Sequence, residues 1–408
     1  MSKSWNRTET WVALIVVGVG LLLVAIPGLW VYMSATSTPL HPDSHSVPSV
    51  THSDSSREWA DAVERGRQIM RAGLTEQNLP GLSVAVGVGD DIVWAEGFGW
   101  ADFENRVEVA PDTRFKIGMA SKVLTSAAVG LLLEKDRLNL DHEIQTYVPE
   151  FAKKHWPVTL RQLMGHLAGI GNDAGDEGPL MEHCERTVEG LRLFADDRLL
   201  FEPGTQYRYS NYGWILVSAA VETAAGEPFL TFMRKQIFEP LRMDDTRPDF
   251  ATKPISDRAA FYFPRFAADP RYGPQPPREI DCSCFAGSAA FLSTPSDLVR
   301  FGMAISSGKL LQPATVQLLQ TPQRLPSGQE TGYGLGWDLE TVTLDGEQTR
   351  VVGHDGEVMG GMLVSFMTFP ERGIVVAVAS NISYADTFSL ALKVAQAFAE
   401  QARSPARK

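Results

Sequence analysis

The longest uncharged stretch of the sequence lies near its N-terminus. Residues Trp11 to Met33 form a run of 23 without a single Asp, Glu, Lys or Arg. At about 1.5 Å of rise per residue, a helix of this length crosses a hydrocarbon core of roughly 30 Å. Trp11 begins the run, and Trp30 and Tyr32 lie near its other end, where amphipathic rings favour the membrane interface. The pattern predicts a transmembrane helix over residues 11–33.

The charges that flank this run indicate its orientation. Lys3 and Arg7 precede it, whereas residues 34–56 contain no Lys or Arg. By the positive-inside rule, residues 1–10 are expected in the cytoplasm and the main domain outside it, in the periplasm of a Gram-negative cell. A cleaved signal peptide is the alternative. Against it, the apolar run is longer than the ~7 to 15 residues of a signal core, and no A-x-A pattern follows.

Residues 34–57 are rich in Ser, Thr, Pro and His and poor in apolar side chains. Such a segment buries too little surface to offset its ordering entropy, so we expect a flexible tether. Its histidines, His41, His45 and His52, are expected to be solvated rather than bound to a metal. The main domain is expected over residues 58–403.

The composition of the chain excludes several classes of protein. A hydrophobic content of 44% and a charged content of 21% are typical of a folded protein. The net charge of -12 argues against a nucleic-acid surface, which needs clustered cations. The sequence contains no C-x-x-C pair or H-E-x-x-H stretch, so neither a metal site nor a cofactor is expected. The sequence does not determine an oligomeric state.

Alternating and helical apolar patterns predict an α+β domain. Strands are expected at both ends of the domain and helices mainly between them, so the C-terminal segment would complete a single antiparallel sheet, with a mainly helical lobe inserted in the middle. A binding site is expected at the seam between sheet and lobe. The expected strands are Leu82–Val88, Ile92–Phe98, Tyr333–Val342, Met362–Phe369 and Ile374–Ala379, and the expected helices are Glu58–Leu74, Leu124–Leu133, Leu160–His166, Gly213–Ala225 and Ala385–Ala402.

Three short motifs in fixed order carry the expected chemistry. The first opens an apolar helix and reads Phe-Lys-Ile-Gly-Met-Ala-Ser-Lys over residues 115–122. The second is Tyr-Ser-Asn over residues 209–211, and the third is Gly-His-Asp-Gly over residues 353–356. Together with the accessory stretches 158–166 and 286–298, they resemble the serine β-lactamase and D-Ala-D-Ala peptidase superfamily, in its class C, esterase and β-lactamase-like branch. The resemblance covers roughly residues 60 to 400 and implies a β-lactamase/transpeptidase-like fold.

The resemblance also implies site residues for acyl transfer to a small-molecule or peptide substrate. Lys122 would assist deprotonation of a nucleophile one turn earlier on the helix, and Tyr209 would pass the proton to the leaving group. Asn211 would orient a substrate amide, and His354 would line the far wall of the cleft. Gly356 and Glu357 would border the substrate, with the backbone amides of Met119 and Glu357 as oxyanion donors.

The sequence departs from the family pattern at the nucleophile. In the S-x-x-K pattern a serine stands three residues before the lysine, and here that position is Met119. A thioether has no proton to lose and forms no acyl ester. Ser121 is an alternative nucleophile, but at about 100° per residue it points roughly 160° away from Met119 on the helix, whereas Lys122 lies within about 60° of it. Hydrolysis and a non-catalytic binding role, for a cell-wall peptide or a partner protein, are therefore both open.

Each motif also has an ordinary structural explanation. Lys122 alone is compatible with a solvated surface residue, Asn211 with a helix cap, and His354 with a turn. Met119 is compatible with an apolar gap filler. His166 is compatible with a core residue or with a residue that supports the site from behind the catalytic side chains, rather than with a catalyst. Co-occurrence of the motifs in one chain favours the functional interpretation. In an extracytoplasmic domain Cys184 is able to pair with either Cys282 or Cys284.

Overall fold

The fold is described from a computed structural model of the chain, which covers residues 7–52, 57–171, 182–249, 256–276, 279–358 and 361–403. An eight-stranded sheet lies at its centre, with the strand order β1-β3-β2-β11-β10-β9-β8 and β4 paired with β3. All of these pairs are antiparallel. The strands are β1 (Ser49–Val50), β2 (Gly81–Val88), β3 (Asp91–Asp102), β4 (Val107–Glu108), β8 (Asp338–Leu344), β9 (Glu347–Val358), β10 (Gly361–Phe369) and β11 (Ile374–Ser380).

The two ends of the domain meet in the middle of this sheet. β2 pairs with β11, so that Leu82 lies opposite Ser380 and Val88 opposite Ile374. The single sheet completed by the C-terminal segment is therefore confirmed. Gly89 and Asp90 form the turn that joins β2 to β3, and Gly89 adopts a left-handed φ of 61° there.

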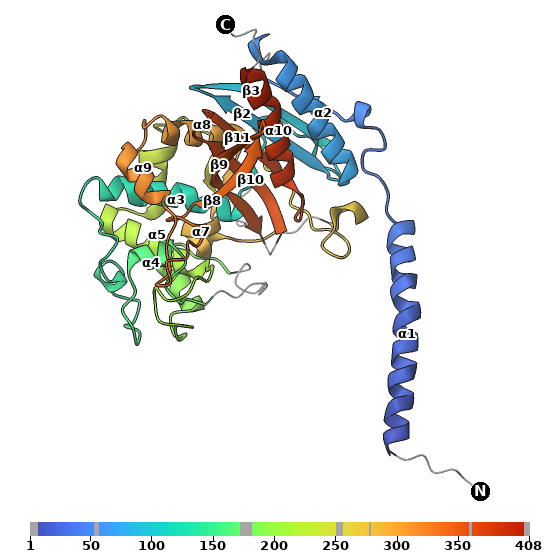
Figure 1. Cartoon of the computed structure of the whole chain (residues 1–408), viewed down its shortest axis with the longest axis horizontal. Coiled ribbons are helices and arrows are strands. Elements are labelled where there is room, and N and C mark those ends of the chain that lie inside the picture. The colour runs from blue at the N-terminus through green and yellow to red at the C-terminus, as the bar shows by residue number, and fades with distance from the viewer. Residues whose placement is uncertain are drawn as a thin grey trace.

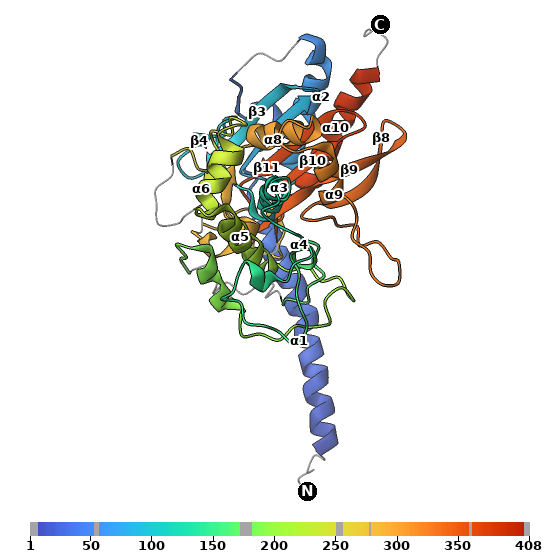
Figure 2. The same cartoon turned by 90° about the vertical axis from the view of Figure 1, so that its left-hand side faces the viewer.

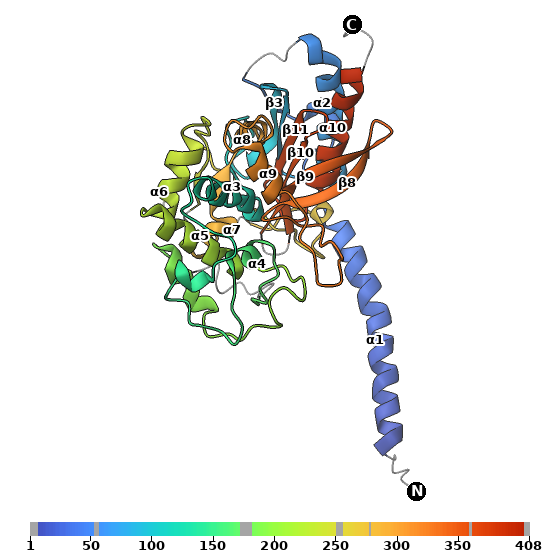
Figure 3. The same cartoon turned by 60° about the vertical axis from the view of Figure 1, so that its left-hand side comes forward.

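Each face of the sheet is covered by helices (Figure 1). Successive residues of a strand point to opposite faces. Leu82 and Val84 of β2 belong to the core beneath α2 (Ala60–Glu76) and α10 (Thr387–Arg403), whereas Ala85 belongs to the core on the side of α8 (Pro295–Ser306). The helical lobe extends that second core, and Figure 3 shows it beside the sheet.

The inserted lobe is mainly helical, as expected. Its central helix α5 (Tyr212–Ala225) is buried on nearly all sides and ends at Gly226, which is left-handed. A three-stranded sheet of order β5-β7-β6 joins the lobe to the rest of the domain. The remaining elements between β4 and β8 are β5 (Phe115–Lys116), η3 (Gly118–Ala120), α3 (Ser121–Leu133), η4 (Ile144–Thr146), α4 (Leu160–Met164), η6 (Thr187–Leu193), α6 (Phe229–Met233), η7 (Arg234–Phe238), β6 (Arg247–Pro248), η8 (Pro270–Tyr272), η9 (Ser283–Phe285), α7 (Ala286–Ala289), β7 (Phe291–Ser293) and α9 (Pro313–Leu319).

One predicted strand differs from the structure. The strand expected over 333–342 begins only at Asp338, because the preceding residues form an irregular segment in which Gly336 has a φ of 97°. A side chain on Gly336 would come within 2.5 Å of the Trp214 ring, so this close approach requires glycine. The third motif lies within the 12-residue strand β9, where the sequence analysis placed no strand.

The N-terminal helix α1 (Arg7–Ala35) extends away from the domain (Figure 2). Its segment Leu14–Ala35 is long and apolar enough to cross a membrane, by length and composition, and a signal sequence has the same properties. Pro27 lies inside the helix without interrupting it. Lys3 lies outside the described residues.

The segment after α1 differs from the expected tether over its described part, residues 36–52. β1 pairs with β3, with Ser49 opposite Phe98. His41 is buried rather than solvated, and its Nε2 lies 3.1 Å from the Pro80 carbonyl oxygen. Backbone pairing and a buried ring therefore stabilise a segment whose composition indicated disorder. Residues 53–56 lie outside the described residues.

Candidate active site

Two glycines bring the first and third motifs together. Gly118, with a φ of 48°, begins η3, and a side chain there would come within 2.1 Å of the Glu357 carbonyl oxygen. A side chain on Gly356 would come within 2.2 Å of the Ile117 carbonyl oxygen. The backbone before α3 therefore lies directly against β9. This contact brings the backbone around Met119 close to Glu357, the two residues whose amides are the predicted oxyanion donors.

Lys122 joins the first and second motifs. It lies in the first turn of α3 with no exposed surface. Its Nζ donates hydrogen bonds to the Tyr209 hydroxyl at 2.5 Å and to Asn211 Oδ1 at 2.7 Å. It also lies 4.2 Å from the centre of the Tyr209 ring. The explanation of Lys122 as a solvated surface residue is therefore wrong.

Burial changes the ionisation of this pair. It lowers the pKa of Lys122 well below its usual value, and the carboxylates of Asp338 and Glu357 only partly oppose this. Burial also raises the pKa of Tyr209 well above its usual value, and the same two carboxylates add to that effect. Both shifts favour the neutral forms of the two groups, an amine beside a phenol, and this arrangement suits proton exchange better than an ion pair.

His354 lies on β9 and is bound on both ring nitrogens. Nδ1 lies 2.6 Å from the Asp355 carbonyl oxygen, which only accepts, so Nδ1 carries the proton. Nε2 then accepts the hydrogen bond from the Tyr333 hydroxyl at 3.0 Å. The Asp338 carboxylate lies 3.6 Å from Nδ1. Burial lowers the pKa of His354, which Asp338 partly opposes. His354 is thus a neutral, oriented wall residue and not a turn residue.

His166 supports the second motif from behind. It has a left-handed φ of 59°, and its Nδ1 accepts a hydrogen bond from the Ser210 backbone amide at 3.1 Å. Its ring centre lies 4.3 Å from that of Tyr209 and 4.6 Å from that of Tyr333. Burial lowers the pKa of His166 well below its usual value, so the ring is neutral. His166 therefore stabilises the position of Tyr209 in two ways: it binds the backbone amide of the next residue, Ser210, and it packs against the Tyr209 ring.

The two candidate nucleophile positions have different surroundings. Met119 is partly exposed and packs on the main core. Ser121 is fully buried, and its Oγ has no hydrogen-bond partner among the described residues. Ser121 is therefore not hydrogen-bonded to Lys122 or Tyr209, and the geometry gives it no base. Met119 lies in η3 and Ser121 is the first residue of α3.

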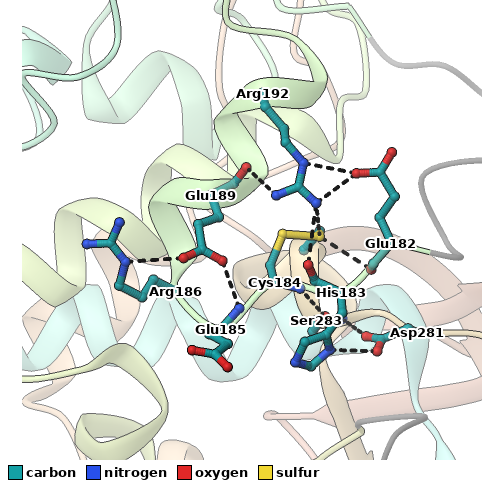
Figure 4. Close-up of a disulfide and its surroundings, with 10 residues drawn as sticks. Glu182, His183, Cys184, Glu185, Arg186, Glu189, Arg192, Asp281 and Ser283 are labelled. Atoms are coloured by element: carbon teal, nitrogen blue, oxygen red, sulfur yellow. Dashed lines mark hydrogen bonds and ion pairs between the residues drawn. A yellow bond between two sulfur atoms is a disulfide. The ribbon is translucent and has the colours of Figure 1, made fainter.

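A second group of Ser, His and Asp lies beside a disulfide (Figure 4). Cys184 pairs with Cys284, which resolves the alternatives left by the sequence, and Cys282 is a buried free thiol. His183 Nδ1 lies 2.8 Å from Asp281 Oδ2 and 3.3 Å from Ser283 Oγ. In a catalytic triad the acid and the nucleophile bind different ring nitrogens. Both contacts here involve Nδ1, so these two contacts do not have the geometry of a catalytic triad.

The sheet, the inserted lobe and the cluster of Lys122, Tyr209 and Asn211 define a β-lactamase and penicillin-binding-protein type of domain. The chain belongs to the Beta-lactamase family, which it matches over residues 67–400.

Curated relatives and solved structures agree with this assignment. The chain is 29% identical to the human "Serine beta-lactamase-like protein LACTB, mitochondrial", over 84% of this chain and 81% of that protein. It is 26% identical to "Penicillin-binding protein 4*" of Bacillus subtilis (strain 168), over 67% of this chain and 62% of that protein. A D-amino acid amidase from Ochrobactrum anthropi SV3, solved with L-phenylalanine amide, has the same fold, with a TM-score of 0.71, 22% identity and coverage of 84% of this chain and 100% of that chain. The hydrolase EstCE1 has a TM-score of 0.67 at 22% identity, covering 84% of this chain and 99% of that chain.

Two residues of the site were missed by the sequence analysis. Tyr333 was assigned to a strand, and Asp338 received no role. The alternation of glycines in Gly-Tyr-Gly-Leu-Gly-Trp, residues 332–337, was the available signal, because glycine weakens a strand and marks close backbone approach.

Proposed function

We propose that this protein binds a peptide, amide or ester ligand in the cleft between sheet and lobe without forming the acyl ester that a serine would form. One observation carries the proposal. The proton-handling cluster of Lys122, Tyr209 and Asn211 is assembled, while the residue three positions before Lys122 is Met119. A thioether at this position offers a ligand carbonyl an apolar contact but no nucleophile.

The remaining parts of the cleft suit recognition of a carbonyl compound. Asn211 presents an amide group next to the Lys122 amine, and η3 lies against β9 where two backbone amides would face a carbonyl oxygen. The ligand class follows from these groups. The named activities of relatives, a penicillin-binding protein and an amidase, agree with a peptide or amide.

Acyl-transfer hydrolysis is the second candidate, and the pKa shifts of Lys122 and Tyr209 toward their neutral forms favour it. It requires a nucleophile other than Met119. Ser121 is the candidate in sequence, but its buried Oγ has no partner among the described residues.

Substitution of Met119 tests both candidates. We expect the natural chain to show no covalent adduct with a fluorophosphonate or a β-lactam by intact-mass measurement, and Met119→Ser to become acylated at residue 119 and to gain esterase activity. Met119→Ala is the matched control, because it opens the same space without a hydroxyl. An adduct on the natural chain at Ser121 would establish the hydrolase. A well-folded Met119→Ser variant without any adduct would contradict a preserved cleft.

We further propose that α1 anchors the domain to a membrane with the domain on the extracytoplasmic side. The apolar segment of α1, the charges at Lys3 and Arg7, and the Cys184–Cys284 disulfide support this topology, because disulfides persist in oxidising compartments. The cleaved signal peptide is the alternative. Extraction of intact cells with alkaline carbonate, followed by mass measurement of the mature chain, separates the two: an anchored chain stays in the membrane with residues 7–35 present.

A further inference from the structure

The loop of residues 265–272 contacts the outer end of α1 (Figure 1). Arg265 Nη1 donates a hydrogen bond to the Thr36 carbonyl oxygen at 2.9 Å. The Tyr32 ring packs edge-on against the Phe266 ring, with 6.2 Å between ring centres. The loop therefore lies at the level of the last turn of the helix, although more than 200 residues separate them in sequence.

Asn78 fixes this loop and the chain after α1 to the domain. Its Oδ1 accepts a hydrogen bond from the Leu40 amide at 2.7 Å. Its Nδ2 donates to the Thr38 carbonyl oxygen at 3.3 Å and to the Arg271 carbonyl oxygen at 3.2 Å. One side chain with 8% exposure thus joins three segments, so that α1, the loop and the domain have a defined relative position.

The position of Thr36 gives the depth of the loop in a membrane. The apolar run ends at Met33, and Thr36 follows it by three residues, or about 4.5 Å along a helix. The polar layer on each side of the hydrocarbon core is about 5 to 7 Å thick. If α1 crosses the bilayer, Thr36 lies in the headgroup layer, and the guanidinium of Arg265, which binds it, lies there too.

The side chains of the loop suit that layer. The Arg265 guanidinium lies 5.0 Å from the centre of the Phe266 ring, and the Phe266 and Tyr272 ring centres are 6.4 Å apart. Ala267 and Ala268 are exposed. Aromatic rings with a neighbouring cation are typical of the interface between lipid and water, where the cation attracts phosphate groups.

We propose that residues 265–272 form a membrane-contacting loop whose partner is the phospholipid headgroup layer, and that this contact fixes the orientation of the domain on the membrane. The inference rests on the proposed anchoring by α1. In this arrangement the domain contacts the bilayer at two places, α1 and the loop, and does not move freely on a flexible tether.

Spin labels at three positions test the proposal. The full chain, with Cys282→Ser to remove the free thiol, is reconstituted in vesicles of phosphatidylcholine and phosphatidylglycerol and labelled at Ala267→Cys, Asp90→Cys or Val19→Cys. Asp90 is the matched control, because it is exposed on the turn between β2 and β3, away from α1. Val19 reports on α1 itself. The measured quantity is the ratio of collision rates with oxygen and with a water-soluble nickel chelate.

We expect this ratio at Ala267 to be several-fold higher than at Asp90 and lower than at Val19. A label at Ala267 that behaves as Asp90 does, while Val19 is lipid-embedded, overturns the loop contact and leaves the anchoring intact. A water-exposed Val19 overturns the anchoring, and the loop contact with it. The double variant Asn78→Ala, Arg265→Ala should lower the ratio at Ala267 toward that of Asp90. Arg324→Ala, which removes an exposed arginine elsewhere, is the control and should leave the ratio unchanged. An unchanged ratio in the double variant would contradict the role of Asn78 and Arg265.

Discussion

The amine of Lys122 and the hydroxyl of Tyr209 lie 2.5 Å apart, although 87 residues separate them in sequence. The contact joins the first turn of α3 to the segment before α5, so it exists only when these two parts of the chain are packed together. Because Lys122 is fully buried, it costs stability unless its hydrogen-bond partners are present. The packing of this pair, three residues after Met119, is the central feature of the candidate site.

The first prediction concerns the role of this pair once a nucleophile is supplied. In the Met119→Ser background, Lys122→Met should abolish the gained esterase activity, by about 10²- to 10⁴-fold, since a positioned proton acceptor contributes that much. Tyr209→Phe should reduce it over the same range. Steady-state hydrolysis of an activated ester measures both. Lys309→Met, which removes an exposed lysine, is the control and should leave activity unchanged. Equal activity with and without Lys122 would show that the pair takes no part in acyl transfer.

A second prediction follows from the contact between Gly118 and β9. Gly118→Ala should destabilise the fold far more than Gly89→Ala. Both residues have a left-handed φ, at 48° and 61°, and each alanine incurs about 1 to 2 kcal/mol of backbone strain. Only at residue 118 does the new side chain also come within 2.1 Å of a backbone oxygen, whereas at residue 89 it meets nothing within 4 Å. Chemical denaturation compares the two variants, and similar losses would refute the close contact.

The third prediction concerns the disulfide. Removing it with Cys184→Ala and Cys284→Ala should lower the free energy of unfolding by about 2 to 5 kcal/mol, because the bond closes a long loop in the unfolded chain. The sequence separation is 100 residues. Urea titration with and without reductant measures the effect. Cys282→Ala, at the buried free thiol, is the control: it should cost only the packing of one sulfur and keep the sensitivity to reductant.

The fourth prediction concerns pH and Asp355. Burial raises the pKa of Asp355 to about 7 from 3.8. The folded state therefore binds more protons than the unfolded state between these values, so the contribution of Asp355 to stability is complete below pH 3.8 and is lost as the pH rises toward 7. Asp355→Asn should remove this part of the pH dependence, as measured by thermal unfolding across that range.

The Asp355→Asn variant should still lose some stability as the pH rises, because burial also raises the pKa of Asp297, to about 6. If natural chain and Asp355→Asn have parallel stability profiles between pH 4 and 7, the carboxyl is ionised in the folded protein and the argument from burial is wrong.

Much of the sheet was predictable because its strands have strong local signals. β2 and β11 are short apolar runs bounded by glycine, proline or serine, and the turn after Val88 contains a glycine. β9 gave a weaker signal, since it contains His354 and two glycines among polar residues. Its strand structure comes from pairing with β8 and β10 on both sides, which is a tertiary effect that no local pattern contains.

The sequence predicted some residues of the candidate site but not Tyr333, Asp338 or the geometry. The motifs gave Lys122, Tyr209 and Asn211, and the structure brings these three together. Sequence patterns do not give the protonation of the pair, because it depends on burial by residues from several elements. The sequence indicated a core or supporting role for His166, but not its contact with the Tyr209 ring or its left-handed φ of 59°.

The docked residues 36–52 determine where the folded unit begins. The amide of Gly99 donates to the carbonyl oxygen of Pro48, and β1 occupies the outer edge of β3. A chain shortened to start at Arg57 would leave that edge open, and an open strand edge is a template for other strands. A domain cut at Arg57, the boundary that composition indicates, should therefore self-associate, whereas a domain cut just after the apolar run should not.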